Sequence, residues 1–230
     1  MSGRVLGGSL GVVLLLLLPG GLWAQPTAAK LAPGEAAQVH ELSQLMAAFS
    51  GMPGLEARFV EEKRLGLLAR PLTSRGRLWF ARPGMLLRRT EQPHAAEVVI
   101  TPSAVRLKDA SGEQQIDLAA RPDVRPFVES LTWLLAGDER ALATVYHLEF
   151  VPRAAAGTWQ LTLTPKAEPL AHLIAHIQII GQGYVVSEIH VREKGGDETV
   201  TRITDANPAR KFSPSELTSL FGVKPKSSSQ

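Results

Sequence analysis

An alternation of apolar and polar residues with a period of two is the feature that most constrains how this chain folds. It begins at Leu55, where Leu55, Ala57 and Phe59 alternate with Glu56 and Arg58. Such alternation is typical of β-strands with one buried face, and short turns between consecutive strands predict antiparallel pairing. The same pattern recurs at 76–82, 97–100, 105–108, 114–118, 146–150, 158–164, 173–180, 185–192 and 199–204.

So many consecutive strands have to curl to bury their shared apolar face. Helical patterns interrupt them: one over Glu35–Phe49, a second over Pro122–Ala136 with a short helix after it, and a third starting at a capping box, Ser213–Glu216. The simplest arrangement lays these helices across the concave face. The sequence therefore predicts a mainly β fold with an α lid, an unclosed antiparallel β-barrel whose strongly curved sheet is covered by two to three amphipathic helices.

The N-terminus reads as a secretory signal peptide over residues 1–24. Arg4 gives it a positive start, Leu10–Leu18 is an unbroken apolar run, and Ala24 provides a small residue for cleavage. The run has 9 residues, whereas a membrane-spanning helix needs about 20. We expect a linker over 25–34, one domain over 35–223 and a flexible tail over 224–230. Export without any cysteine fits a periplasmic location.

Composition excludes several classes of function. The absence of cysteine excludes disulfide scaffolds, cysteine nucleophiles and cysteine-ligated metals, and a net charge of +3 does not indicate a nucleic-acid partner. His172 and His176 would share one face of a strand, which is a weak candidate metal site. No catalytic motif appears, so we predict a protein that is not an enzyme, with no metal and no cofactor; a hydrolase whose residues lie far apart in sequence remains the alternative.

A basic stretch lies between Glu62 and Glu91, where eight Lys and Arg residues occur without one acidic residue. In an exported protein this pattern favours contact with anionic lipid headgroups or an acidic partner. A solvated strand face is the other interpretation. The candidates for partner or headgroup contact are Arg75, Arg77, Arg88 and Arg89.

Four short segments carry a resemblance to a known family: SRGRLWFARP at 74–83, LEARFVEEK at 55–63, WQLTLTPK at 159–166 and NPARKF at 207–212. Together they resemble the LolA family of periplasmic outer-membrane lipoprotein carriers, over most of residues 42–212. The G-x-L-W-F-x-R-P run is the most specific of them. Leu86 and Arg88 depart from the family, which usually has aromatic residues at those positions.

The resemblance implies an unclosed barrel with a helical lid, acting as a shuttle, and we expect the protein to be a monomer. Such a shuttle takes lipoproteins from an inner-membrane release complex and passes them to an outer-membrane receptor. The family's lid-contacting arginine corresponds to Arg82, whose rigid fork can donate to backbone carbonyls of a lid helix. Two alternatives stay open: a carrier of a glycolipid, polyene or other amphiphile, and a non-carrier periplasmic adaptor.

For a carrier, the sheet and its lid would enclose an apolar cavity, in which each buried methylene contributes roughly 0.8 kcal/mol. Any of the apolar residues concerned could equally form a solid core. The candidate cavity residues are Leu78, Phe80, Met85, Leu86, Trp159, Leu161 and Leu163. The candidate lid residues are Leu42, Leu45, Met46, Phe49, Phe127, Leu131, Leu134 and Leu135.

Overall fold

One antiparallel sheet of eleven strands dominates the computed structural model, which describes residues 39–122, 125–153 and 157–222. The expected signal peptide, linker and tail lie outside these residues. The strands are β1 Gly54–Arg64, β2 Leu72–Ala81, β3 Met85–Gln92, β4 Ala96–Ile100, β5 Ala104–Asp109, β6 Gly112–Asp117, β7 Tyr146–Pro152, β8 Thr158–Pro165, β9 Ile174–Gln182, β10 Val185–Glu193 and β11 Glu198–Asn207. The helices are α2 Leu42–Gly51, α3 Arg125–Ala136, α4 Glu139–Val145, α5 Leu170–Leu173 and α6 Pro214–Phe221.

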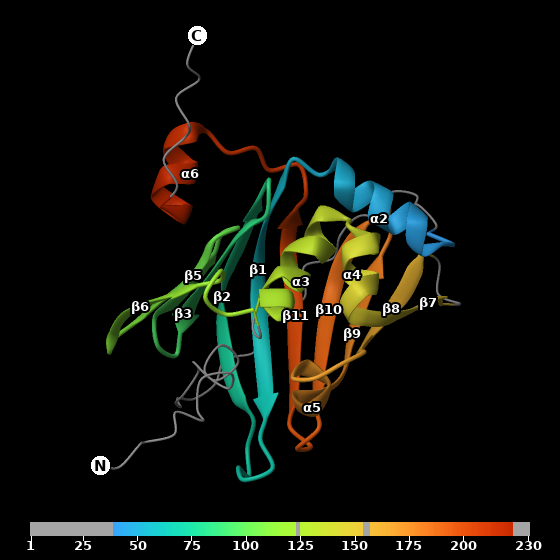
Figure 1. Ribbon diagram of the computed structural model, residues 1–230, viewed down its shortest axis with the longest axis horizontal. Coiled ribbons are helices and arrows are strands. Elements are labelled where there is room, and N and C mark those ends of the chain that lie inside the picture. The colour runs from blue at the N-terminus through green and yellow to red at the C-terminus, as the bar shows by residue number, and fades with distance from the viewer. Residues whose placement is uncertain (1–38, 123–124, 154–156, 223–230) are drawn as a thin grey trace.

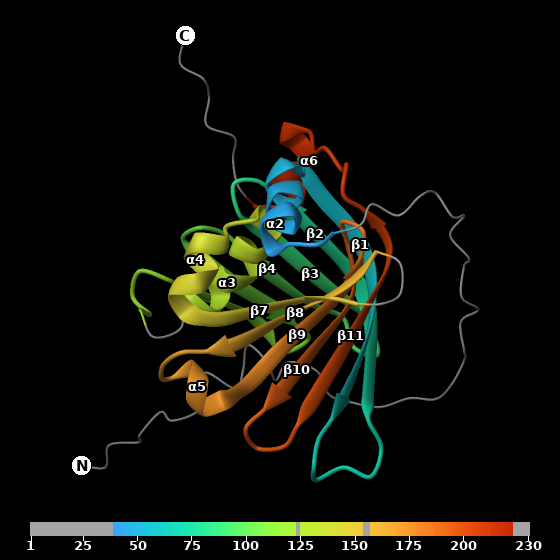
Figure 2. The same ribbon diagram turned by 90° about the vertical axis from the view of Figure 1, so that its right-hand side faces the viewer.

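The strand order places the first strand in the middle of the sheet. It runs β6-β5-β4-β3-β2-β1-β11-β10-β9-β8-β7, so β1 pairs with β2 on one side and with β11 on the other. The two edges are β6 and β7, and the sheet curves between them without closing (Figures 1 and 2). This confirms the predicted unclosed antiparallel barrel with helices.

Alternation along the strands separates two faces, each covered by different helices. On what we call the inner face, Phe80 and Leu86 pack with Val128 of α3. On the outer face, their neighbours Trp79 and Leu87 pack with Phe221 of α6. Figure 1 shows α2, α3 and α4 gathered on one side of the sheet and α6 on the other.

Two helices differ from expectation, and one agrees with it. Helix α2 begins at Leu42, later than the pattern predicts, although Val39 before it is buried. Helix α4 is the predicted short helix and is capped by Asp138, whose carboxylate accepts from Ala141 N at 2.9 Å. The single turn α5 was not predicted, because His172 and its neighbours resemble the start of a strand. None of the helices in the described residues has the length and apolarity to cross a membrane.

Helix α6 contradicts the expectation that all helices lie across the concave face. It forms where the capping box predicts it, with Ser213 as N-cap and Pro214 at its first position. Its Phe221 is buried against the outer face of β2, β3 and β4. The strongly apolar outer residues of those strands would otherwise face solvent, which explains why a helix is needed there.

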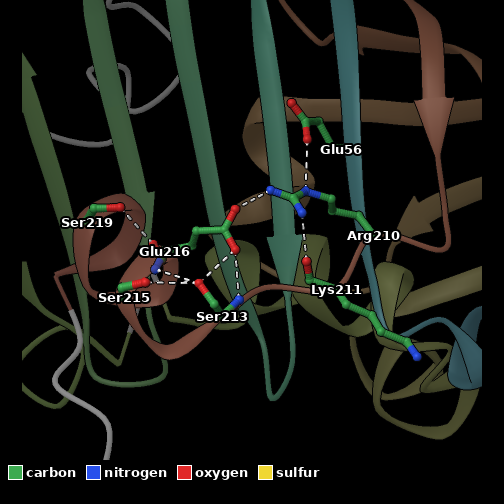
Figure 3. A network of polar contacts seen from close by, with 7 residues as sticks. All are labelled: Glu56, Arg210, Lys211, Ser213, Ser215, Glu216 and Ser219. Atoms are coloured by element: carbon green, nitrogen blue, oxygen red, sulfur yellow. Dashed lines mark hydrogen bonds and ion pairs between the residues drawn. The ribbon is translucent and has the colours of Figure 1, made fainter.

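A network of polar contacts ties α6 to the middle of the sheet (Figure 3). Arg210 donates from Nε to Glu56 of β1 at 3.0 Å and from Nη2 to Glu216 of α6. Glu216 also accepts from the backbone N–H of Ser213 at 2.8 Å. These contacts with Ser213 and with Arg210 favour the ionised carboxyl and lower the pKa of Glu216 to about 2.

This network predicts a pH-dependent contribution of Glu216 to stability. Since the pKa of Glu216 in the folded protein lies below its ordinary value of 4.5, the contribution is present above about pH 4.5 and is lost as the pH falls toward 2. We expect Glu216→Gln to lower the thermal midpoint at pH 7, and the gap to the wild type to shrink between pH 4.5 and pH 2. A gap that stays constant over this range would contradict the prediction.

Candidate functional site

Arg82 joins the end of β2 to the C-terminal end of α2. Its Nε donates to the carbonyl of Met52 at 2.7 Å, and its Nη2 donates to the carbonyls of Phe49, at 2.8 Å, and Ser50. The last carbonyls of a helix have no partner within the helix and carry its negative dipole end. A guanidinium donates hydrogen bonds to these carbonyls and places a positive charge at the negative end of the helix dipole. This contact with helix carbonyls is the one that the resemblance implies.

A glycine lets α2 lie directly on the turn between α3 and α4. At Gly137 a Cβ would lie 2.1 Å from the carbonyl oxygen of Met46 and 2.6 Å from the N of Ser50. Its φ of 72° also favours glycine. Helix α2 is therefore held by Arg82 at its end and by close backbone contact along its length.

The predicted cavity residues fall into two apolar clusters of the inner face. The β7–β9 cluster contains Trp159, Leu161 and Leu163, and the β2–β5 cluster contains Phe80 and Leu86, with Leu78 partly buried against it. Helix α3 contacts both, because Leu134 packs in the first cluster and Val128 in the second. Of the predicted lid residues, the β7–β9 cluster takes Leu45, Met46, Phe49 and Leu134 with Leu42 beside them, the β2–β5 cluster takes Leu135, and Phe127 touches both.

Two predicted site residues lie elsewhere. Met85 packs on the outer face with Trp79 and Phe221, because it neighbours Leu86 on a strand and adjacent residues point to opposite faces. Leu131 is 38% exposed and belongs to neither cluster, although helical spacing places it on the same face of α3 as Val128 and Leu134. Neither residue joins the others beneath α2.

The protein's own side chains fill the space at the centre of both clusters. Phe80, Trp159 and Leu161 have 0% exposed surface, and the Trp159 indole donates to the carbonyl of Gly183 at 2.7 Å. At these positions the structure has a packed core beneath the helices.

The four arginines predicted to contact a partner do not share one surface. Arg75, Arg77 and Arg89 lie on the outer face, where Arg77 pairs with Glu91 at 3.0 Å and Arg89 with Glu97 at 2.6 Å. Acidic residues of β3 and β4 thus compensate the charge that looks unbalanced in the sequence. The fourth, Arg88, points to the inner face, opposite to its neighbour Arg89.

Arg88 forms a two-pronged ion pair with Glu61, a residue that the sequence analysis did not single out. Both guanidinium Nη atoms lie 2.8 Å from a carboxylate oxygen, and Thr201 Oγ1 donates to the same carboxylate at 2.9 Å. Burial acts to raise the pKa of Glu61, but the charge and hydrogen bonds of Arg88, with Thr201 and Lys63, lower it overall. The Arg88 guanidinium also lies 4.3 Å from the ring centroid of Phe59.

One exposed apolar feature is not indicated by the sequence pattern. Leu67, in the loop between β1 and β2, is 98% exposed, and Leu68 beside it is exposed as well.

The candidate metal site of two histidines does not form as predicted. His172 lies in α5 and not on a strand, so it does not share a strand face with His176. Within residues 39–122, 125–153 and 157–222, no group of three or more acidic or histidine side chains is placed to hold a metal ion.

Comparison with known families identifies the chain. The sequence profile of the outer membrane lipoprotein carrier protein LolA-like family matches residues 32–220. The chain belongs to the LolA-like family. No curated protein matches it.

Several solved structures are similar to this LolA-like chain in fold. A LolA superfamily protein from Nitrosomonas europaea has 9% identity and a TM-score of 0.43, with 76% of this chain and 96% of that chain covered. A putative outer membrane lipoprotein-sorting protein domain from Vibrio parahaemolyticus has 12% identity and a TM-score of 0.41, with 72% and 90% covered. LprF from Mycobacterium bovis has 12% identity and a TM-score of 0.36, with 76% and 100% covered.

The three hydrogen bonds of Arg82 predict a specific cost for its removal in this LolA-like protein. Arg82→Leu leaves three helix-end carbonyls without the guanidinium, and we expect a loss of about 2 kcal/mol in the free energy of unfolding. Urea denaturation measures this loss, and hydrogen exchange should be faster for amides of α2 than elsewhere. Arg75→Leu, on the exposed face of β2, the strand that Arg82 follows, is the matched control. If the α2 amides exchanged hydrogen equally fast in Arg82→Leu and Arg75→Leu, the Arg82 contact would not be what holds α2 in place.

The Arg88–Glu61 pair predicts a larger cost that a second substitution recovers. Arg88→Met leaves the buried Glu61 carboxylate without its partner, and we expect a loss of about 3 kcal/mol. The double variant Glu61→Leu/Arg88→Met should regain most of this stability, because no buried charge then remains. The control is Arg89→Met, in the exposed pair next to it. A loss no larger than that of Arg89→Met would show that the pair is not effectively buried.

Proposed function

We propose that this LolA-like protein is a non-catalytic carrier that shields the acyl chains of lipoproteins between two membranes. The apolar clusters under α2 and α3 would receive the chains when α2 moves away. The observation that carries the proposal is the Arg82 contact, in which a single side chain holds the end of the covering helix through hydrogen bonds alone. Such contacts can break and reform without chemistry.

In this proposal the packed core describes the cargo-free state. Side chains of the β7–β9 cluster occupy the space that cargo would take, so binding competes with closure of α2. A ligand that binds only an open state has its apparent affinity reduced by the fraction of molecules that are open. Arg82 thus sets how readily cargo enters and how completely it leaves.

The proposed location is the periplasm, after export and cleavage near Ala24. The partners would be the cargo, an inner-membrane release complex and an outer-membrane receptor, as the resemblance implies. The exposed Leu67, with Arg64 and Arg70 nearby in sequence, gives the β1–β2 loop a composition suited to an anionic membrane surface. The cargo could also be a glycolipid, a polyene or another amphiphile that an export system handles.

A second candidate function is a periplasmic adaptor that carries nothing. The observation in its favour is the complete burial of Phe80, Trp159 and Leu161, which leaves no exposed surface at those positions. An adaptor would act through its surface and would need no movement of α2.

Variants that loosen α2 distinguish these two functions. Arg82→Leu removes the contact at its end, and Gly137→Ala places a Cβ against the carbonyl of Met46. If each destabilises the closed state by about 2 kcal/mol, the apparent affinity for a fluorescent fatty acid should rise about 30-fold, and its release should slow. The measurements are probe titration and mass spectrometry of lipids that co-purify with the exported protein.

Two controls accompany these variants. Arg75→Leu removes an exposed arginine, and Gly196→Ala changes a glycine of positive φ that has open space around it. We expect both to bind the probe like the wild type. If no variant binds the probe and no lipid co-purifies, the carrier proposal fails and the adaptor is favoured.

A further inference from the structure

A cluster of polar side chains lies on the inner face, farther along the strands than the apolar clusters. Cross-strand pairing brings Glu61 of β1 opposite Ser74 of β2 and Thr201 of β11, and brings Lys63 opposite Thr199. Directly opposite residues point to the same face, so all five share the inner face. We call them the polar cluster. In Figure 1, β1 starts near α2 and ends at the opposite end of the sheet, where these residues lie.

The polar cluster continues the β2–β5 cluster along the same strands. Leu86 belongs to that apolar cluster, and Arg88 follows it two residues later on the same face of β3. Arg88 then reaches Glu61, and its guanidinium stacks on Phe59, two residues before Glu61 on β1. On β1 and β3 the inner face therefore changes from apolar to polar between one inward-facing residue and the next.

The acidic residues of this region already have their hydrogen-bond donors. Glu61 accepts from Arg88 on both oxygens and from Thr201 on one, and its lowered pKa keeps it ionised. Lys63 lies 3.3 Å from Glu193, whose side chain is 22% exposed at the margin of the cluster. An ammonium has three N–H groups, so one contact with Glu193 does not exhaust it.

Two hydroxyl groups of the cluster have no partner. Ser74 Oγ and Thr199 Oγ1 are buried without a hydrogen bond, in residues that are 5% and 9% exposed. Buried hydroxyls in native proteins are normally paired. Among the described residues the other such atom is Arg77 Nε, on the outer face, 3.0 Å from a carboxylate oxygen of Glu91. The two unpaired hydroxyls thus flank Glu61 and Lys63 on the inner face, and each has an O–H free to donate to a further acceptor.

We infer that the polar cluster binds the acidic headgroup, a carboxylate or a phosphate, of an amphiphile whose tail lies in the apolar clusters. This inference rests on the proposed carrier function. The headgroup accepts from Ser74, Thr199 and Lys63, and the Glu193 carboxylate turns outward to solvent as the headgroup replaces it beside Lys63. A carboxylate headgroup then leaves the charge beside Lys63 unchanged, because one monoanion exchanges for another, whereas a phosphate monoester adds about half to one negative charge.

A matched series of ligands with one tail tests the headgroup. The probes are laurate, dodecyl phosphate and dodecanol, with inorganic phosphate as the probe without a tail, titrated calorimetrically into the wild type. We expect both acids to bind at least 10-fold tighter than dodecanol, and inorganic phosphate to bind far more weakly than dodecyl phosphate. Equal binding of acid and alcohol would overturn the headgroup site while leaving the carrier function standing. Equal binding of the two phosphates would overturn the amphiphile as its ligand.

The double variant Ser74→Ala/Thr199→Ala tests whether the preference for acids over dodecanol comes from the polar cluster. It removes hydroxyls that make no hydrogen bond, so the fold should be retained, which the thermal midpoint checks. We expect the acids to lose their advantage over dodecanol to within twofold, with dodecanol binding unchanged. The control Thr73→Ala/Thr204→Ala removes exposed hydroxyls from the outer face of the same two strands. A preference that survives in the first double variant would overturn the inference, and binding of no probe by either the wild type or Arg82→Leu would overturn the carrier function itself.

Discussion

The alternation of side chains along an antiparallel strand governs most of this structure. On β2, β3 and β4, one set of residues packs with α3 and the alternate set packs with α6. Both sets are apolar at the end of β2 and the start of β3, so both faces need helices there. The separation is strict, because a side chain cannot change face without a shift of the whole strand. Phe80 and Trp79 are adjacent in sequence but belong to different cores.

Several parts of this arrangement are readable from the sequence, and they are the local ones. Strand alternation, the capping box at Ser213 and the helical period of α3 depend on residues within one or two turns of each other. Arg82 was found through the resemblance and not through any local pattern. The opposite facing of Met85 and Leu86 follows from the same alternation, as does that of Arg88 and Arg89, because consecutive residues of a strand point to opposite faces.

Other parts require the strand register, which no local pattern supplies. Glu61 and Arg88 are 27 positions apart, and their pairing depends on how β1, β2 and β3 align. The same alignment places Ser74 beside Glu61 and Thr199 beside Lys63. The apparent excess of positive charge over 63–89 has a similar explanation, since Glu91 and Glu97 become neighbours of Arg77 and Arg89 only after the hairpins form.

The two halves of the inner face make different demands on a ligand. Apolar packing rewards any chain that excludes water, and it discriminates weakly between tails of similar size. Unpaired buried hydroxyls discriminate strongly between headgroups. A headgroup that accepts their hydrogen bonds gains binding free energy, and a headgroup that leaves them unsatisfied does not. A carrier with both features would tolerate variation in the tail and select on the headgroup. Arg82 would then control when cargo enters and leaves, while Ser74, Thr199 and Lys63 would control which cargo is accepted.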